Sequence, residues 1–304
     1  MRYKTLVSAS ATFAATVLTL AACGGDAESA ADYEGPYEDL VSSDECEQLR
    51  EDNPDLVGET RTNALNPHVP GYATVSDDNP NEYEGFDIDL GEAVGACLGF
   101  EVDYLSVGFS ELIPTVDSGQ ADWILSNLYA TEERAEGGVD FISYSHVYDG
   151  ILVGDGNPED ITGIDTSLCG TTVALNRGYV EVPLVEAVGP DCEEIGEPAP
   201  ELLLFDAAAD CVQAVRSGQA DSYMNDVNTV NRFIAEHPDE LDSAETVMLD
   251  YEIAIGVPQG EHDFRDAVQE ALMVIQENGL QEELAERWEL DANHVAEPNI
   301  LSVG

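Results

Sequence analysis

The chain has 304 residues and a formal net charge of −53, from 63 acidic and 10 basic residues. So acidic a surface repels nucleic acid and anionic lipid headgroups, because their phosphates need neutralisation by lysine or arginine. A hydrophobic fraction of 43% still supports a packed core, which excludes a disordered chain. The charge is typical of a strongly hydrated surface that works in high salt, where ions screen the repulsion among carboxylates.

The first residues are typical of a secretory signal. Arg2 and Lys4 precede an apolar run that ends in "LAACG", which resembles a bacterial lipobox. The alternative is a transmembrane helix, since the run is nearly long enough to span a membrane. We predict a lipoprotein signal peptide over 1–22, lipid attachment at Cys23, and a mature protein anchored to the cell membrane on its outer side. Residues 23–45 lack periodicity and predict an acidic, extended tether.

Five further cysteines follow in the body of the chain, and an odd number leaves one unpaired. They are Cys46, Cys97, Cys169, Cys192 and Cys211. The preferred disulfide is Cys169–Cys192, which would bracket the strand "TTVALN" and the helix after it. Cys46–Cys97 would join the N-terminal segment to the body, but the pairing of these two and Cys211 stays open. No C-x-x-C pair occurs and the histidines are few and scattered, so we expect no metal site and no cofactor.

The body alternates short β-rich runs with helical stretches. The segment "GFDIDLGEAVGACLGF" predicts a turn and an amphipathic helix, with Leu90, Val94 and Leu98 on one face. The segment "FSELIPTVDSGQ" predicts a helix with Ser110 as its N-cap and Gly119 at its end. The apolar run "ADWILSNLY" is short enough to predict a buried parallel strand.

One pattern occurs twice. The segments "LIPTVDSGQADWIL" and "CVQAVRSGQADSYM" share S-G-Q-A-D at 118–122 and 217–221. Each predicts a helix that ends at a glycine and leads into a core strand. Two similar βαβ halves favour two α/β lobes over a single sheet.

A set of motifs in order along the chain resembles a known family. They are "GFDIDL", "FSELIPTVDSGQAD", "TEERAEGGVDFISYSHVYDG", "VRSGQADSYMND" and "FRDAVQEALMVIQENGLQEELAERW". Together they resemble the family 3 extracellular solute-binding proteins, receptors for polar amino acid ABC importers. The resemblance implies a two-lobe periplasmic-binding-protein fold of type II (a Venus flytrap) with two crossing hinge strands. Lobe 1 would take 46–150 and 252–292, lobe 2 would take 151–251, and 293–304 would form a polar tail.

The resemblance assigns charged ligand contacts to both lobes. Arg134, in a T-x-x-R motif, would grip the ligand α-carboxylate with its planar fork, although a surface ion pair with neighbouring glutamates is the alternative. Asp226 would receive the α-ammonium, and it is equally suited to cap the following helix. Gly178 would let backbone N–H groups approach the carboxylate. Arg177 could face the cleft and favour an anionic ligand, or lie on the surface.

Aromatic and amide side chains complete the expected pocket. Phe109 matches an aromatic that stacks on the ligand, and Tyr72 is a second candidate, although both could be ordinary core residues. Asn127 occupies a position whose backbone carbonyl accepts from the ligand amine. Tyr129 and Tyr179 stand where the family has small residues, so we expect them to shrink or reshape the pocket.

The resemblance implies a monomeric, lipid-anchored receptor without enzymatic activity, which delivers a polar amino acid or related zwitterion to an ABC permease. Two alternatives stay open: a dehydratase on the same fold, and a ligand-sensing module for a membrane partner. The sequence contains no evident nucleophile–base pair and no appended catalytic or signalling domain. The identity of the amino acid stays open.

Overall fold

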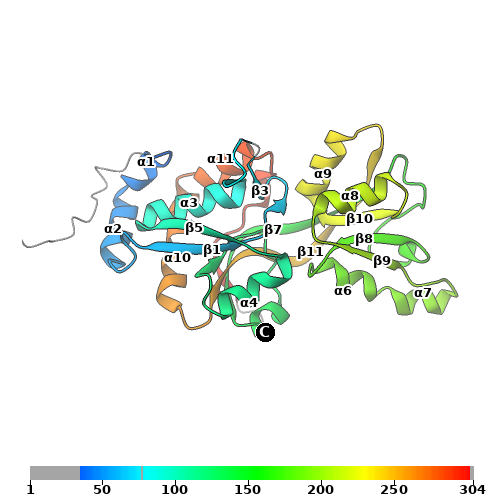
Figure 1. Cartoon of the computed structure of the whole chain (residues 1–304), viewed down its shortest axis with the longest axis horizontal. Helices are drawn as coiled ribbons and strands as arrows, with labels where there is room; N and C mark the ends of the chain where they lie inside the picture. Colours follow the sequence, from blue (N-terminus) through cyan, green and yellow to red (C-terminus); the bar gives the residue numbers. More distant parts are fainter. Residues whose placement is uncertain (1–34, 77, 302–304) are drawn as a thin grey trace, which may run out of the picture.

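The computed structural model describes residues 35–76 and 78–301 and consists of two α/β lobes joined by two long strands (Figure 1). These strands are β7 (Val139–Gly154) and β11 (Leu241–Pro258), which pair antiparallel along most of their length. The parallel strands β5, β1 and β6 lie on one side of the pair, and β10, β8 and β9 lie on the other. This arrangement confirms the predicted fold with its two connecting strands.

A single sheet therefore runs through both lobes, so the expectation that two lobes would exclude a single sheet is wrong: the strands β7 and β11 pair across the junction and join the two halves. Its order is β5, β1, β6, β11, β7, β10, β8, β9, and β12 pairs with β7. The bounds of the shorter strands are Glu101–Ser106 for β5, Thr60–Leu65 for β1, Trp123–Ile124 for β6, Ser222–Asp226 for β10, Thr172–Asn176 for β8, Glu201–Phe205 for β9 and Ile300–Leu301 for β12. A small second sheet contains β2 (His68–Val69), β3 (Ala73–Val75) and β4 (Tyr83–Glu84).

Helices cover the sheet in each lobe (Figure 1). In lobe 1 they are α1 (Glu38–Val41), α2 (Asp44–Asp52), α3 (Phe86–Leu98), α4 (Leu112–Asp117), α5 (Glu132–Glu136), α10 (His262–Glu277) and α11 (Leu280–Arg287). In lobe 2 they are α6 (Glu181–Glu186), α7 (Gly189–Ile195), α8 (Ala208–Arg216) and α9 (Val227–Glu236). The predicted face of α3 is confirmed, because Leu90, Val94 and Leu98 are fully buried in the core of lobe 1. Short 3₁₀ helices occur at Phe109–Glu111, Thr166–Leu168 and Ala292–His294.

The repeated S-G-Q-A-D motif has the same structural role in both lobes. In lobe 1 the Asp122 carboxylate accepts a hydrogen bond of 2.7 Å from the backbone N–H of Thr62. In lobe 2 the Asp221 carboxylate accepts one of 2.7 Å from the backbone N–H of Thr172. Each aspartate follows a helix and ties its own strand to the neighbouring parallel strand. The two occurrences are therefore equivalent corners of two similar half-folds.

Two disulfides brace the lobes. Cys46–Cys97 joins α2 to α3, and Cys169–Cys192 joins the segment after the second 3₁₀ helix to α7. The prediction of Cys169–Cys192 is confirmed, and Cys46–Cys97 is the pairing that the sequence had left open. Cys211 is a free cysteine buried in lobe 2.

The N-terminal predictions fall partly outside the structure. The predicted signal peptide, Cys23 and the first part of the tether lie outside the described residues. Within the described part the prediction of an extended tether to residue 45 is wrong, because α1 and the start of α2 occupy it. Tyr37, Leu40 and Val41 are buried in the core of lobe 1, an attachment too short to show as periodicity. No helix among residues 35–76 and 78–301 is long and apolar enough to cross a membrane.

Two further details differ from the sequence expectations. The predicted N-cap role of Ser110 is wrong: the Gly108 N–H donates to the Glu111 carboxylate at 3.0 Å, so Glu111 caps this turn. The described part of the predicted tail is also bound to lobe 1. The backbone N–H of Asn299 donates to the Ser143 hydroxyl at 3.0 Å, and β12 pairs with β7.

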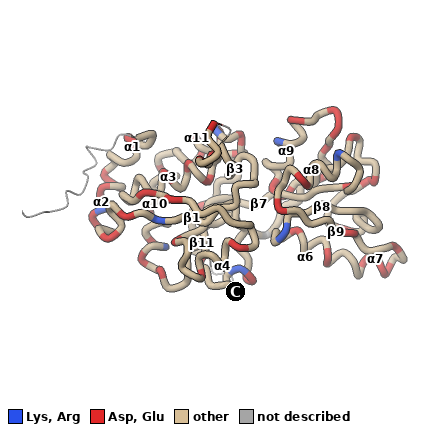
Figure 2. The backbone as a smooth tube through the Cα atoms, in the orientation of Figure 1, with Lys and Arg blue, Asp and Glu red and all other residues tan. Residues whose placement is uncertain are grey.

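Acidic residues are spread over both lobes, whereas Lys and Arg are sparse (Figure 2). This distribution agrees with a strongly hydrated acidic surface. It also means that an arginine between the lobes has an unusual setting in this protein.

Candidate ligand-binding site

Arg134 lies at the junction of the two lobes. It is in α5, whose N-cap Thr131 accepts from the Arg134 backbone N–H at 3.2 Å. Its guanidinium donates to the Tyr129 carbonyl at 2.6 Å and to the Gly178 carbonyl of lobe 2 at 3.0 Å. Burial lowers the pKa of Arg134, which keeps its charge nonetheless. The guanidinium is therefore directed between the lobes rather than toward the neighbouring glutamates.

Aromatic rings meet across the same junction. The rings of Phe109 in lobe 1 and Tyr179 in lobe 2 have centroids 4.1 Å apart, and the Arg134 guanidinium lies 5.2 Å from the centroid of the Phe109 ring. Gly178 has φ +81°, and a Cβ there would lie 3.2 Å from the Cβ of Ser110. Glycine suits both the left-handed backbone and this close approach of the lobes. Its carbonyl contacts Arg134, while the expected role of its N–H stays a prediction.

Asp226 ends β10 and is fully buried. One carboxylate oxygen accepts from the Asn228 backbone N–H at 3.0 Å, so the residue does cap α9. The same oxygen accepts from the Tyr72 hydroxyl of lobe 1 at 3.2 Å. The other oxygen has no hydrogen-bond partner among the described residues. Burial raises the pKa of Asp226 to about 6.

Asn127 follows the buried strand β6 in a left-handed backbone conformation, with φ +45°. Its backbone N–H donates to the buried Asp87 carboxylate at 2.7 Å, and the Tyr144 hydroxyl donates to the other oxygen of Asp87 at 2.9 Å. Burial raises the pKa of Asp87 to about 7. Both side-chain amide atoms of Asn127 are buried without a partner in the described part of the chain. The amide is therefore available to a polar ligand.

Two buried acids beside this group were not predicted from the sequence. Asp149 of β7 is fully buried, and Glu181 at the start of α6 is 1% exposed. The Tyr129 hydroxyl donates to one oxygen of Asp149 at 3.0 Å. The other oxygen of Asp149 and both oxygens of Glu181 lack a hydrogen-bond partner among residues 35–76 and 78–301. The sequence contains only two signals for these residues: Asp149 is an acid inside an apolar β-run, and Glu181 follows Tyr179 by two residues. Neither signal stands out among 63 acidic residues.

The two acids lie in one electrostatic environment. Burial, followed by the neighbouring Glu181 carboxylate, raises the pKa of Asp149 well above its ordinary value. Burial raises the pKa of Glu181 to about 7, and the charge of Arg134 acts in the opposite direction. One half-buried arginine thus faces a group of buried carboxyls between the lobes. Arg177 does not join them, because it is exposed and pairs with Asp206 at 3.2 Å.

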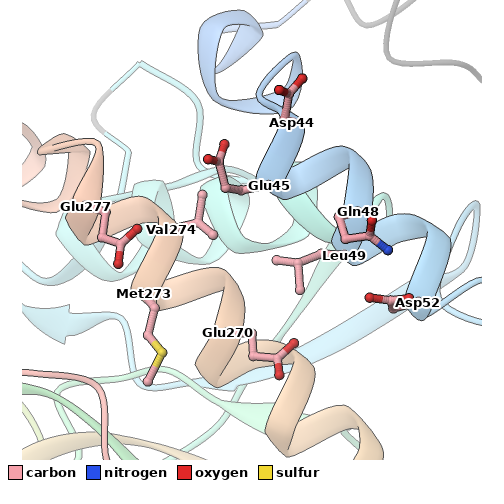
Figure 3. A pocket seen from close by; sticks show the side chains of 9 residues that line it. All are labelled: Asp44, Glu45, Gln48, Leu49, Asp52, Glu270, Met273, Val274 and Glu277. Carbon is pink, nitrogen blue, oxygen red and sulfur yellow. The ribbon is translucent and has the colours of Figure 1, made fainter.

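A separate groove lies on the outer surface of lobe 1, between α2 and α10 (Figure 3). It encloses about 480 Å³. Its lining residues are Asp44, Glu45, Gln48, Leu49, Asp52, Glu270, Met273, Val274 and Glu277. The groove contains none of the predicted site residues and no basic side chain, so its chemistry does not suit an amino acid carboxylate. In the described segments no group of His, Cys, Asp and Glu residues is arranged to hold a metal ion.

Comparisons with known proteins agree with the fold. Residues 62–291 match the bacterial extracellular solute-binding proteins, family 3. Arginine-binding protein ArgT of Corynebacterium glutamicum is 27% identical over 236 residues, covering 77% of this chain and 75% of that protein. An ancestral arginine-binding protein bound to arginine superposes with a TM-score of 0.69 at 23% identity, covering 75% of this chain and 97% of the other. An ancestral amino acid-binding protein, a precursor of cyclohexadienyl dehydratase, superposes with a TM-score of 0.66 at 22% identity, covering 79% and 99%.

The family match spans most of the chain, from the first strand of lobe 1 through lobe 2 to the C-terminal helices. The solved structures share the fold of this chain. In this chain Arg134 and Asp226 lie on opposite sides of the junction. The chain therefore belongs to the bacterial extracellular solute-binding proteins of family 3.

Proposed function

We propose that this protein binds an α-amino acid between its lobes, outside the cytoplasm, and delivers it to an ABC importer. The observation that carries the proposal is Arg134, a guanidinium directed between the lobes in an otherwise strongly acidic protein. Family membership and a relative named for arginine binding support an amino acid as the ligand.

Arg134 has the capacity to hold a carboxylate. A guanidinium has five N–H donors, and two of them serve the carbonyls of Tyr129 and Gly178. The remaining three suit the two parallel hydrogen bonds of a carboxylate. A ligand that filled the space between the lobes would exclude water from this pair and strengthen it.

The opposite end of the ligand backbone would be received by Asp226. Its partnerless oxygen suits an α-ammonium, and the partnerless amide of Asn127 would supply a further polar contact. Tyr72 hydrogen-bonds Asp226 from the other lobe and would hold it in place. Because Arg134 belongs to lobe 1 and Asp226 to lobe 2, one ligand would bridge the lobes and favour their closed arrangement.

The cellular setting is part of the proposal. Lipid attachment at Cys23 would keep a monomeric receptor beside its permease in the membrane. The protein would bind its ligand without converting it. Incubation with prephenate or arogenate tests the dehydratase alternative, which predicts product formation.

Thermal-shift and calorimetric titration of the purified protein in high salt, against the twenty standard L-amino acids, tests the function. Binding to the folded state stabilises it by about 2.7 kcal/mol when the ligand concentration is 100 times Kd. We expect a saturable rise in Tm with at least one amino acid. If no amino acid shifts Tm or releases heat, the proposal is wrong.

A further inference from the structure

The buried acids Asp149 and Glu181 have no role in holding the backbone of an amino acid, because Arg134 and Asp226 serve that purpose. We propose that Asp149 and Glu181 form a subsite for a cationic side chain. The ligand would then be an amino acid with a guanidinium or ammonium group on its side chain. This inference rests on the proposed function and names the class of its ligand.

The first argument is the state of the carboxyl groups. Asp149 is fully buried and Glu181 is 1% exposed, yet no side chain of another described residue donates a hydrogen bond to three of their four oxygens. The two carboxyl groups instead interact with each other. A buried carboxylate is costly unless it is paired and hydrogen-bonded. A cation with several N–H donors would satisfy all three oxygens.

The second argument is the position of Tyr129. Its backbone carbonyl accepts from Arg134, and its hydroxyl, at the far end of the side chain, donates to Asp149. The acidic pair therefore lies about one tyrosine side chain away from the guanidinium. A ligand whose carboxylate is held by Arg134 would reach the pair with an extended side chain. Tyr129 thus orients Asp149 through its hydroxyl group.

The third argument is charge. The groups around the pair are Arg134 and Tyr129 from lobe 1, and Asp226 and Tyr179 from lobe 2. An α-carboxylate balances Arg134 and an α-ammonium balances Asp226, so Asp149 and Glu181 are left over. A ligand with a neutral side chain leaves them to share a proton, whereas a cationic side chain compensates their charge. A guanidinium matches two carboxyls especially well because of its planar fork.

Calorimetric titration with L-arginine and L-citrulline isolates this charge, because citrulline replaces the guanidinium by an uncharged urea of similar shape. Losing one partner of a buried charge pair costs about 2–5 kcal/mol, so we expect wild type to bind L-arginine at least about 30-fold more tightly than L-citrulline. The comparison needs no variant. Equal affinities, or tighter binding of L-citrulline, would overturn the inference.

Variants locate the effect. In Asp149→Asn and Glu181→Gln the preference for L-arginine should fall at least about 10-fold, because each change removes one of the compensating charges while keeping the side-chain shape. Glu186→Gln is the matched control, an exposed glutamate on the same helix, and should keep the wild-type preference. A preference that survives in both Asp149→Asn and Glu181→Gln would overturn the assignment of these residues.

Failures of the two proposals are distinguishable. If wild type binds some standard amino acid but discriminates against L-arginine, L-lysine and L-ornithine, the cationic subsite is wrong and the proposed function stands. If it binds no amino acid at all, the proposed function is wrong, and this inference falls with it.

Discussion

The two lobes share a scaffold but differ in the chemistry they bring to their junction. In both, the aspartate of an S-G-Q-A-D motif ties one parallel strand to the next, through Asp122 in lobe 1 and Asp221 in lobe 2. At the junction lobe 1 contributes the cation Arg134, whereas lobe 2 contributes the acids Asp226 and Glu181. The repeated scaffold therefore accounts for the shared fold, and the unlike junction residues are the ones that we propose to bind the ligand.

This difference suits a ligand that is itself a dipole. A carboxylate favours the lobe with the guanidinium, and an ammonium favours the lobe with the acids. Asp149 lies on β7, one of the two strands that connect the lobes, and so is assigned to neither lobe. Changes at the junction should alter binding, while changes at the shared corners should alter stability.

The largest effect is expected for Arg134→Ala, which removes the only cation assigned to the ligand. Affinity for the amino acid should fall at least about 100-fold, because a buried charge would lose its partner. Calorimetry measures the affinity, and thermal unfolding in high salt checks that the variant is folded. Arg177→Ala, a change of an exposed arginine paired with Asp206, is the control and should bind like wild type.

Asp226→Asn tests the other lobe and should weaken binding by about 30-fold. Asparagine is a good N-cap, so this change removes the charge while keeping the cap of α9. Asp226→Ala also removes the cap of α9, so its free energy of unfolding should be about 0.5–2 kcal/mol lower than that of Asp226→Asn. The same affinity for wild type and Asp226→Asn would show that the α-ammonium does not bind there.

The shared corners are tested by Asp122→Ala and Asp221→Ala. Each should lower the free energy of unfolding by about 1.5–3 kcal/mol, because a hydrogen bond from a backbone N–H to a charged group is lost. Both should leave affinity within about threefold of wild type, measured on the folded protein. The exposed Asp55 provides the control, Asp55→Ala, with an expected change below about 0.5 kcal/mol. If only one of the two variants, Asp122→Ala or Asp221→Ala, lowered the free energy of unfolding, the two motifs would not be equivalent.

The smallest effect concerns pH and Glu181. Its pKa is raised to about 7 in the folded protein, above the ordinary value of a glutamate. Between these values the folded state holds a proton that the unfolded state has released, so stability falls as pH rises through this window. Glu181→Gln should raise Tm by about 2–4 °C at pH 8 and leave it nearly unchanged at pH 4. A gain of the same size at both pH values would contradict a titrating Glu181.

Much of the fold was predictable because its signals are local. The buried face of α3, the repeated glycine-ended helices and the Cys169–Cys192 disulfide follow from spacing and residue type within short segments. The contacts of α1 and of the C-terminal segment were missed. Their attachment depends on a few side chains that meet distant parts of lobe 1, such as Asn299 with Ser143.

The site was predictable only in part. Arg134 and Phe109 from lobe 1 do meet Gly178 and Tyr179 from lobe 2, but their roles toward a ligand stay predictions. Asp149 and Glu181 were missed because burial, not residue type, distinguishes them from the many solvated acids of this chain. Similarly, only the structure separates Arg177 at the surface from Arg134 at the junction.

The central claim, a carboxylate held by Arg134 between the lobes, is tested most directly by changing both partners. The standard L-amino acid that binds wild type most tightly and its α-carboxamide are titrated into wild type and Arg134→Ala. We predict that loss of the ligand's carboxylate charge weakens binding to wild type at least about 30-fold, and has almost no effect in Arg134→Ala. A carboxamide that binds wild type as tightly as the acid would contradict the account.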